Sequence, residues 1–292
     1  MERLEAAMAK ARATRDEGQQ AGLASDALAD GQSGRARFTR PSLAGSDKDH
    51  ISGSSRGDWS SLPVIDIQPR QAKARRINAV MGAASASHYD MLRSRVLRQM
   101  TENNWTRLAV TSPRAKSGKS TISLNLALSL ARSGDQRIIL MDFDLRHPTL
   151  ATLLGIKHAP EIAGLFHPGV FFKDYAGRHG SNLAICTNRT PVRNSAELLQ
   201  GRSAKDLLDR IQDEWQPDIM IFDTPPMLGV DDNLGFFAHI DCALIVAGAG
   251  SDTIAQIDRC DQEVAALTNV LGTVLNKCRY PDKSTGFDNA YY

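Results

Sequence analysis

The sequence has few cysteines, and none of them stands at the spacing of a metal or disulfide site. Its 292 residues include four cysteines and no Cys-x-x-Cys pair; the four are Cys186, Cys242, Cys260 and Cys278. Zinc sites and small disulfide-bonded domains both depend on closely spaced cysteines, so the sequence argues against these two classes. We expect all four thiols to be small buried side chains in a reducing compartment.

Long apolar runs and a strong charge imbalance are also missing. No stretch of about 18 consecutive apolar residues occurs, so we expect no membrane-spanning helix. Residues 1–18 carry charges throughout and lack the apolar centre of a secretory signal. The formal net charge is +2 and the sequence pI is about 8.4, which gives no reason to expect nucleic-acid binding. If the protein works at a membrane, a partner has to bring it there.

Residues 1–16 are predicted to form a short amphipathic helix. Met1, Leu4 and Met8 recur at helical spacing, and charged side chains occupy the other faces. One narrow apolar stripe cannot form a core by itself. The helix therefore either docks on a partner or on the body of the protein, or it frays without a role.

Residues 17–77 are predicted to be a flexible linker, because up to Trp59 they are rich in Gly, Ser, Asp and Arg and poor in large apolar side chains. Near its end, residues 62–67 form a short extended segment that we expect to pack on the main domain. A basic run follows, which either contacts anionic lipid headgroups or is solvated surface. Its members are Arg70, Lys73, Arg75 and Arg76.

The pattern changes at residues 78–278, which we predict to be one α/β domain. A helix of about 18 residues comes first, with a buried stripe that includes Tyr89 and Val96. Nearly continuous apolar runs then alternate with helical segments, which is typical of a parallel sheet covered by helices on both faces. The predicted strands are residues 107–112, 137–144, 218–225, 242–249 and 270–276. Residues 279–292 are expected to be a flexible tail.

A phosphate-binding loop is predicted between the first strand and the helix that follows it. The string SGKST places Ser117, Gly118, Lys119, Ser120 and Thr121 where a turn enters a helix, so that backbone N–H groups point at phosphate oxygens. In this pattern Lys119 reaches the β- and γ-phosphates of ATP and Ser120 ligates Mg²⁺. The domain is therefore predicted to be a P-loop NTPase, with a largely disordered region before it.

Three carboxylates end predicted strands on the same edge of the sheet. Asp142 and Asp144 are two residues apart and point to one side, and Asp223 ends another strand. The carboxyl ends of parallel strands face one crevice, so these groups are expected around the phosphates, as the chemistry of Mg²⁺·ATP requires.

Four strings in this chain resemble motifs of the bacterial tyrosine kinases of capsule and exopolysaccharide systems. VTSPRAKSGKST resembles their Walker A segment, LMDFDLRHP their second Walker motif, IMIFDTPP their Walker B motif, and NSAELL a segment between them. The resemblance implies an ATP-dependent tyrosine kinase. In such an enzyme Lys119 and Ser120 hold the phosphates and Mg²⁺, Asp142 accepts the proton of the attacking tyrosine, and Asp144 and Asp223 hold the metal.

The resemblance also suggests roles for residues other than the lysine, the serine and the aspartates named above. Arg146 is expected either near the phosphates or as a residue that stabilises its loop. Asn276 either contacts the adenine or is a turn residue that ends its strand. The phospho-acceptors would be tyrosines of the tail, namely Tyr280, Tyr291 and Tyr292.

A partner and a location follow from the same resemblance. The family pairs such chains with a membrane polysaccharide chain-length regulator that activates the kinase, so we expect a cytoplasmic protein held at the inner face of the plasma membrane. A homo-oligomer is consistent with the family. Ring assembly is in doubt, because the positions that match the family's Glu-x-x-Arg-x-x-Arg motif are Ser87, Asp90 and Arg93, and only Arg93 is kept.

The loop departs from the family at Lys116, where glycine is usual; a residue with a Cβ is tolerated there if its φ stays negative. The Lys116 side chain either adds a phosphate contact or points to water. Two other functions remain open. A placement ATPase would carry a signature lysine where this chain has Arg114. A nucleotide-binding scaffold would switch a membrane partner without transferring phosphate.

Overall fold

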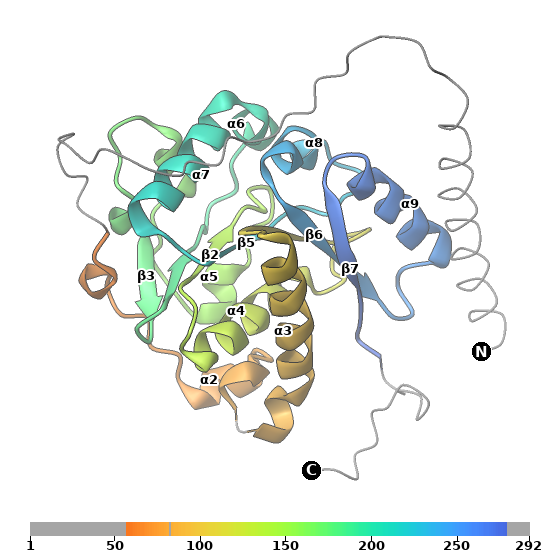
Figure 1. Cartoon of the computed structure of the whole chain (residues 1–292), viewed down its shortest axis with the longest axis horizontal. Coiled ribbons are helices and arrows are strands. Elements are labelled where there is room, and N and C mark those ends of the chain that lie inside the picture. Colours follow the sequence, from red (N-terminus) through yellow and green to blue (C-terminus); the bar gives the residue numbers. More distant parts are fainter. Residues whose placement is uncertain (1–56, 82, 279–292) are drawn as a thin grey trace, which may run out of the picture. The chain divides into compact units, whose positions relative to one another are not determined.

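A computed structural model of the chain describes residues 57–81 and 83–278 (Figure 1). They contain a seven-stranded sheet with the order β3-β4-β2-β5-β1-β6-β7. The strands are β1 (Arg107–Thr111), β2 (Ile138–Asp142), β3 (Ala176–His179), β4 (Leu183–Cys186), β5 (Ile219–Asp223), β6 (Cys242–Gly248) and β7 (Asn269–Asn276). The pairing of β3 with β4 is antiparallel, and all the other pairings are parallel.

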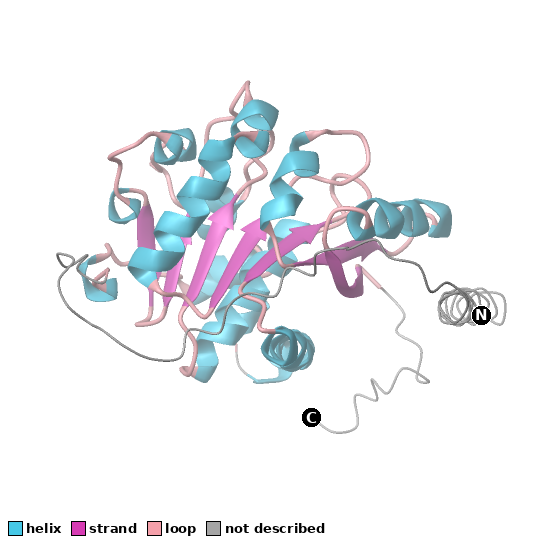
Figure 2. Cartoon of the chain, turned by 45° about the horizontal axis from the view of Figure 1, so that its top comes forward, coloured by secondary structure: helices cyan, strands magenta, loops and turns pink. Residues whose placement is uncertain are grey.

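Helices cover both faces of this sheet, as Figure 2 shows. The α-helices are α2 (Pro69–Ala74), α3 (Ala83–Asn103), α4 (Lys119–Ser133), α5 (Leu150–Leu154), α6 (Ser195–Gln200), α7 (Arg202–Trp215), α8 (Asp232–Phe236) and α9 (Ile254–Ala265). Five short 3-10 helices accompany them within the described residues: η1 (Trp59–Ser61), η2 (Asn78–Val80), η3 (Ile162–Phe166), η4 (Phe172–Asp174) and η5 (Phe237–His239).

Alternate side chains of the strands enter two separate apolar cores. Leu108 and Val110 of β1 pack in the core beneath α2, α3, α4 and α5. Ala109, between them, packs in the core formed with α6, α7, α8 and α9. Because both faces of each central strand are buried, those strands are almost entirely apolar. The predicted α/β fold with a mostly parallel sheet is confirmed.

The edge strand β3 and its neighbour β4 were not among the strands predicted from the sequence. Each has only four residues, and β3 includes the half-buried polar residues Arg178 and His179. Its sequence therefore lacks the continuous apolar run that revealed the central strands. The antiparallel pairing of β3 is also invisible to an argument that follows strand–helix alternation.

Residues 57–77 are not the free linker that composition predicts. The N–H of Gly57 donates to the carbonyl of Glu214 at 2.8 Å. Trp59 is buried, its ring centroid lies 5.9 Å from that of Trp215, and its indole Nε1 donates to the Trp215 carbonyl at 3.1 Å. The folded body therefore extends further toward the N-terminus than the boundary at residue 78, because a few large apolar side chains anchor a polar segment.

The expected extended segment, residues 62–67, does pack on the main domain. Leu62 and Ile67 are buried, and Val64 forms a parallel bridge with Arg178 of β3. The basic run lies on α2 and just beyond it. The helix predicted for residues 1–16 lies outside the described residues.

Helix α3 packs on α4, as its buried stripe predicts. One of its acidic side chains is engaged inside the molecule: Asp90 accepts hydrogen bonds from the Ser129 hydroxyl at 2.6 Å, from Arg93 at 3.3 Å, and from Arg132. Burial, the largest single effect, raises the pKa of the Asp90 carboxyl, but the hydrogen bonds from Ser129 and Arg132 and the charges of Arg132 and Arg93 together outweigh it and lower the pKa.

Three of the four cysteines are buried, as expected, whereas Cys278 is exposed. The prediction for Cys278 is wrong because this residue follows the last strand and has no covering layer. No helix within residues 57–81 and 83–278 is long and apolar enough to span a membrane.

Candidate nucleotide site

The predicted phosphate-binding loop connects β1 to α4 at the carboxyl edge of the sheet. Gly118 stands immediately before the helix with φ = 101°, and Lys119 begins α4. A side chain at Gly118 would be strained at this φ, and its Cβ would lie 2.1 Å from Asn276 Nδ2. Glycine is therefore required there, and the first N–H groups of α4 are left facing the crevice. This arrangement is the anion-binding geometry that the motif predicts.

Lys119 is held between two carboxylates at the mouth of this loop. Its Nζ lies 2.6 Å from Asp144 Oδ2 and 3.9 Å from Asp223 Oδ1. Burial lowers the pKa of the Lys119 ammonium, but the charges of Asp223 and Asp144 outweigh this effect and raise the pKa above its ordinary value. The lysine is therefore a fixed positive charge at the place where phosphates would bind.

Asp142 and Asp223 end neighbouring strands in the same register. The backbone N–H groups of Thr149 and Leu150, at the start of α5, donate to Asp142 Oδ2 at 3.1 and 3.0 Å. Asp223 Oδ1 accepts from the Ser123 hydroxyl at 3.3 Å. The remaining oxygens, Asp142 Oδ1 and Asp223 Oδ2, are buried and have no hydrogen-bond partner among the described residues.

Burial governs the protonation of these two carboxyl groups. It raises the pKa of Asp142 well above the usual range, and the charge of Asp223 adds to this effect. Burial also raises the pKa of Asp223, although Lys119 pulls it down. Each of these buried carboxyl groups has one oxygen without a partner, so a bound cation or a proton beside them would be stabilising.

Arg146 pairs with two aspartates at the start of α8. Its Nε donates to Asp232 Oδ2 at 2.6 Å, and its guanidinium lies 3.1 Å from Asp231 Oδ1. Asp232 is the first residue of α8 and is fully buried. Of the two roles expected for Arg146, the structure supports the one in which it stabilises a loop.

Asn276 contacts the phosphate-binding loop, and Lys116 is part of that loop. Asn276 Nδ2 donates to the carbonyl of Ser117 at 2.9 Å, so this residue does more than end β7. Lys116 has φ = 68°, in the left-handed region. The condition of a negative φ is therefore not met: the loop has a glycine-like conformation here, although the residue is lysine. Ser123 was not predicted because it lies 100 positions from Asp223, and the donors at the start of α5 were missed because the turn that brings them back to Asp142 carries no recognised motif.

The carboxylates do not form a ready-made metal cage. Within the described part of the chain, no three acidic, histidine or cysteine side chains are arranged to hold a metal ion. This is compatible with Mg²⁺, which usually keeps several waters and is bound by one or two carboxylates together with substrate phosphates.

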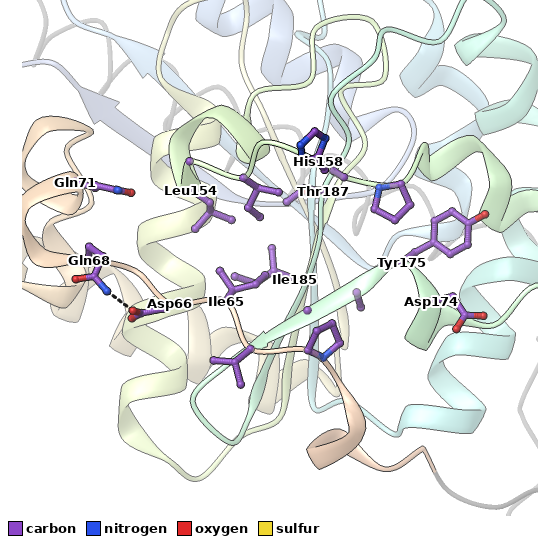
Figure 3. A pocket seen from close by; sticks show the side chains of 18 residues that line it. Ile65, Asp66, Gln68, Gln71, Leu154, His158, Asp174, Tyr175, Ile185 and Thr187 are labelled. Carbon is purple, nitrogen blue, oxygen red and sulfur yellow. Dashed lines mark hydrogen bonds between the residues drawn. The ribbon is translucent and has the colours of Figure 1, made fainter.

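A separate pocket of about 460 Å³ lies between residues 63–71 of the arm that spans residues 57–77, strands β3 and β4, and the end of α5. Figure 3 shows Leu154 and His158 on one side of it, with Ile65 and Asp66 on the other. None of the residues around Lys119 lines this pocket. It is therefore distinct from the nucleotide site.

Comparisons with known proteins agree with this geometry. The ParA family model, described as an NUBPL iron-transfer P-loop NTPase, matches residues 105–286. The tyrosine-protein kinase CpsD of Streptococcus pneumoniae is 30% identical over 179 residues, which cover 58% of this chain and 75% of CpsD. The chain belongs to the bacterial tyrosine kinases within the ParA family of P-loop NTPases.

Other bacterial tyrosine kinases show the same relationship. Etk of Escherichia coli K12 is 27% identical over 234 residues, covering 78% of this chain but only 30% of Etk, so the chain spans less than a third of that relative's length. The solved kinase domain of VpsO is 25% identical with a TM-score of 0.60, and the match covers 73% of this chain and all of that domain. The chimerical protein CapA2B2, 21% identical with a TM-score of 0.63, covers 76% of this chain and 96% of its own; this match shows the fold.

Proposed function

We propose that the protein is an ATP-dependent protein tyrosine kinase that phosphorylates itself and regulates polysaccharide polymerisation and export. The observation that carries the proposal is the cluster at the phosphate-binding loop. Lys119 lies 2.6 Å from Asp144, beside two buried carboxylates with unpartnered oxygens. Phosphoryl transfer depends mainly on positioning and charge neutralisation, and this cluster offers both.

The residues of the loop fit Mg²⁺·ATP. The N–H groups at the start of α4 and the Lys119 ammonium would hold the phosphates, with Ser117, Gly118 and Thr121 as parts of the same cradle. Ser120, Asp144 and Asp223 are the candidates to hold Mg²⁺ directly or through water. When bound, the ion neutralises charge that develops on the transferred phosphoryl group.

Asp142 is the proposed acceptor of the tyrosine proton. The two N–H groups from the start of α5 fix its orientation through Oδ2, which leaves Oδ1 for the incoming hydroxyl. Burial raises the pKa of this carboxyl, and a raised pKa favours proton transfer to it. Arg146 would assist only indirectly, by holding α8 through Asp232.

The proposed acceptors, Tyr280, Tyr291 and Tyr292, lie outside the described residues. Their place in the chain supports the proposal, because they follow β7, whose end contacts the phosphate-binding loop through Asn276. Asn276 is also the proposed adenine contact, since it already lies beside this loop.

The partner, the location and the assembly belong to the same proposal. A membrane polysaccharide chain-length regulator would activate the kinase and hold it at the inner face of the membrane, with no role for nucleic acid. Self-association is included, but not through the family's ring motif on α3, because Asp90 is engaged by Arg93, Arg132 and Ser129 of the same chain.

Two other functions receive less support. The curated relatives described above are named tyrosine kinases, which favours phosphate transfer over a placement ATPase or a scaffold. The iron transfer in the family description is not proposed, because the four cysteines include no Cys-x-x-Cys pair.

The test is incubation of the purified full chain with Mg²⁺·ATP, with and without the cytoplasmic tail of the regulator, followed by mapping of phosphorylated residues. We expect phosphate on Tyr280, Tyr291 or Tyr292, and its loss in Lys119→Ala and Asp142→Asn. Asp261→Asn, on the exposed side of α9, is the matched control and should retain it. ATP binding without phosphotyrosine under either condition would refute the kinase and leave a switch or scaffold.

A further inference from the structure

A carboxylate from outside the recognised motifs holds the phosphate-binding loop. Ser117 is buried at 1% exposure, and its Oγ lies 2.7 Å from Asp252 Oδ2. The same oxygen of Asp252 accepts a hydrogen bond from the N–H of Gly248 at 2.6 Å. Asp252 stands between β6 and α9, 135 positions away from Ser117 in the sequence. One carboxylate oxygen therefore joins the loop to the end of a neighbouring strand.

Two further contacts attach the backbone of the loop to the same edge of the sheet. Asn276 donates to the Ser117 carbonyl at 2.9 Å, and Lys277 Nζ donates to the carbonyl of Lys116. The packing is close: a Cβ added to Gly248 would lie 3.4 Å from the Ser117 Cα and 2.4 Å from Ser251 Oγ. The loop is thus held from one side by residues of β6, β7 and the turns that follow them.

This loop needs outside support more than a glycine-rich one would. Lys116 is held in the left-handed region at φ = 68°, a conformation that costs free energy for any residue with a Cβ. Without contacts that favour it, the loop would relax to other conformations. The N–H groups aimed at the phosphates would then lose their common direction.

We propose that Asp252 is a positioning residue that keeps the phosphate-binding loop in its nucleotide-binding conformation through Ser117 and Gly248. The proposal rests on ATP binding at this loop, as proposed above. Hydrogen bonds to a charged acceptor are stronger than neutral ones, which suits a carboxylate to this task. The same negative charge close to a triphosphate opposes binding, so its presence there needs a reason, and positioning supplies one.

The two effects of the Asp252 carboxylate predict opposite results. If Asp252 acted only through its charge, Asp252→Ala and Asp252→Asn would both bind ATP more tightly. If it positions the loop, Asp252→Ala weakens ATP binding, by about tenfold for the loss of one hydrogen bond to a charged group, or about 1.4 kcal/mol. Asp252→Asn should lose less, since its amide oxygen can still accept from Ser117.

The experiment measures the dissociation constant of a fluorescent ATP analogue and the KM for ATP on the full chain. Asp252→Ala should weaken binding about tenfold and Ser117→Ala by no more than that, and the double variant should bind about as Asp252→Ala does, because the contact between Ser117 and Asp252 is already lost in either single variant. The effect should fall mainly on KM, with kcat reduced much less. Asp258→Ala, on the exposed face of α9, is the control and should bind like the unchanged chain.

Circular dichroism and thermal unfolding identify variants that fail to fold, in which case Asp252→Asn carries the test. Tighter or unchanged ATP binding in the folded Asp252 variants, or fully additive effects of Asp252→Ala and Ser117→Ala, would overturn the positioning role. ATP binding without any phosphotyrosine would refute the proposed kinase but leave this role intact. Absence of ATP binding by the unchanged chain would overturn both.

Discussion

Replacing Lys116 by glycine should stabilise the protein, although the substitution removes an entire side chain. Lys116 has φ = 68°, and the left-handed conformation costs a residue with a Cβ about 1–2 kcal/mol. Glycine does not incur this cost. It adds freedom to the unfolded chain, which lowers stability by about 0.4–1 kcal/mol. The Lys116 side chain is exposed, and its carbonyl, which accepts from Lys277, is kept by any substitution.

The balance favours Lys116→Gly by about 0.8 kcal/mol, the difference between the middle of the range for the strain removed and that for the entropy added. For a folded domain of this size, such a change raises the melting temperature by about 1–4 °C. Thermal unfolding of the full chain, followed by circular dichroism without nucleotide, measures it.

The neighbouring residue supplies a matched control. Ala115 is also exposed, but it is not among the residues with positive φ. Ala115→Gly adds only the freedom of the unfolded chain, so it should lower stability by about 0.4–1 kcal/mol. Opposite signs at adjacent positions would support the left-handed conformation of Lys116. A lower melting temperature for Lys116→Gly, similar to that of Ala115→Gly, would show that the reasoning is wrong.

Three other predictions test separate features. Trp59→Ala should cost about 3–5 kcal/mol, as for other large aromatic residues removed from a core, and denaturant unfolding would measure it; a loss below 1 kcal/mol would mean that the arm does not belong to the folded body. Arg146→Ala should cost about 1–3 kcal/mol, because it leaves the buried Asp232 carboxylate with an unpaired charge; an equal stability in Asp232→Asn and in the double variant would support this cause, whereas unchanged stability of Arg146→Ala would contradict it. A thiol reagent should modify Cys278 quickly and the other three cysteines slowly, because those three are buried and burial raises the pKa of their thiols; a fast reaction that persists in Cys278→Ser would contradict it.

The central sheet could be predicted because the burial of its strands is evident from their amino-acid composition. A strand buried on both faces has to be apolar at every position, and β2 and β5 are apolar up to the aspartate that ends each of them. Edge strand β3 has no continuous apolar run, since it includes the half-buried polar residues Arg178 and His179. The packing of residues 57–77 was not predicted because their few buried apolar residues, such as Trp59, stand among many polar ones.

The candidate site could be predicted only where its residues are close in sequence. The loop around Lys119 and the strand-end carboxylates stand in local patterns whose geometry is known. The link between Ser117 and Asp252 joins segments 135 positions apart, and neither residue belongs to a pattern that would identify the other. The same holds for Arg146, whose partners Asp232 and Asp231 lie 86 and 85 positions further along the chain.

The bridge between Val64 and Arg178 has a consequence for the behaviour of the protein in solution. An edge strand with free N–H and C=O groups is a template on which another chain can add a strand and begin to aggregate. Residues 63–65 occupy this template on β3: Ile65 donates to the Arg178 carbonyl, and Arg178 donates to the Pro63 carbonyl. Gly177 leaves room for them, because a Cβ there would lie 2.7 Å from the Ile65 side chain. A chain shortened to begin after residue 66 would keep every residue of the candidate nucleotide site but expose this edge, so its solubility should fall.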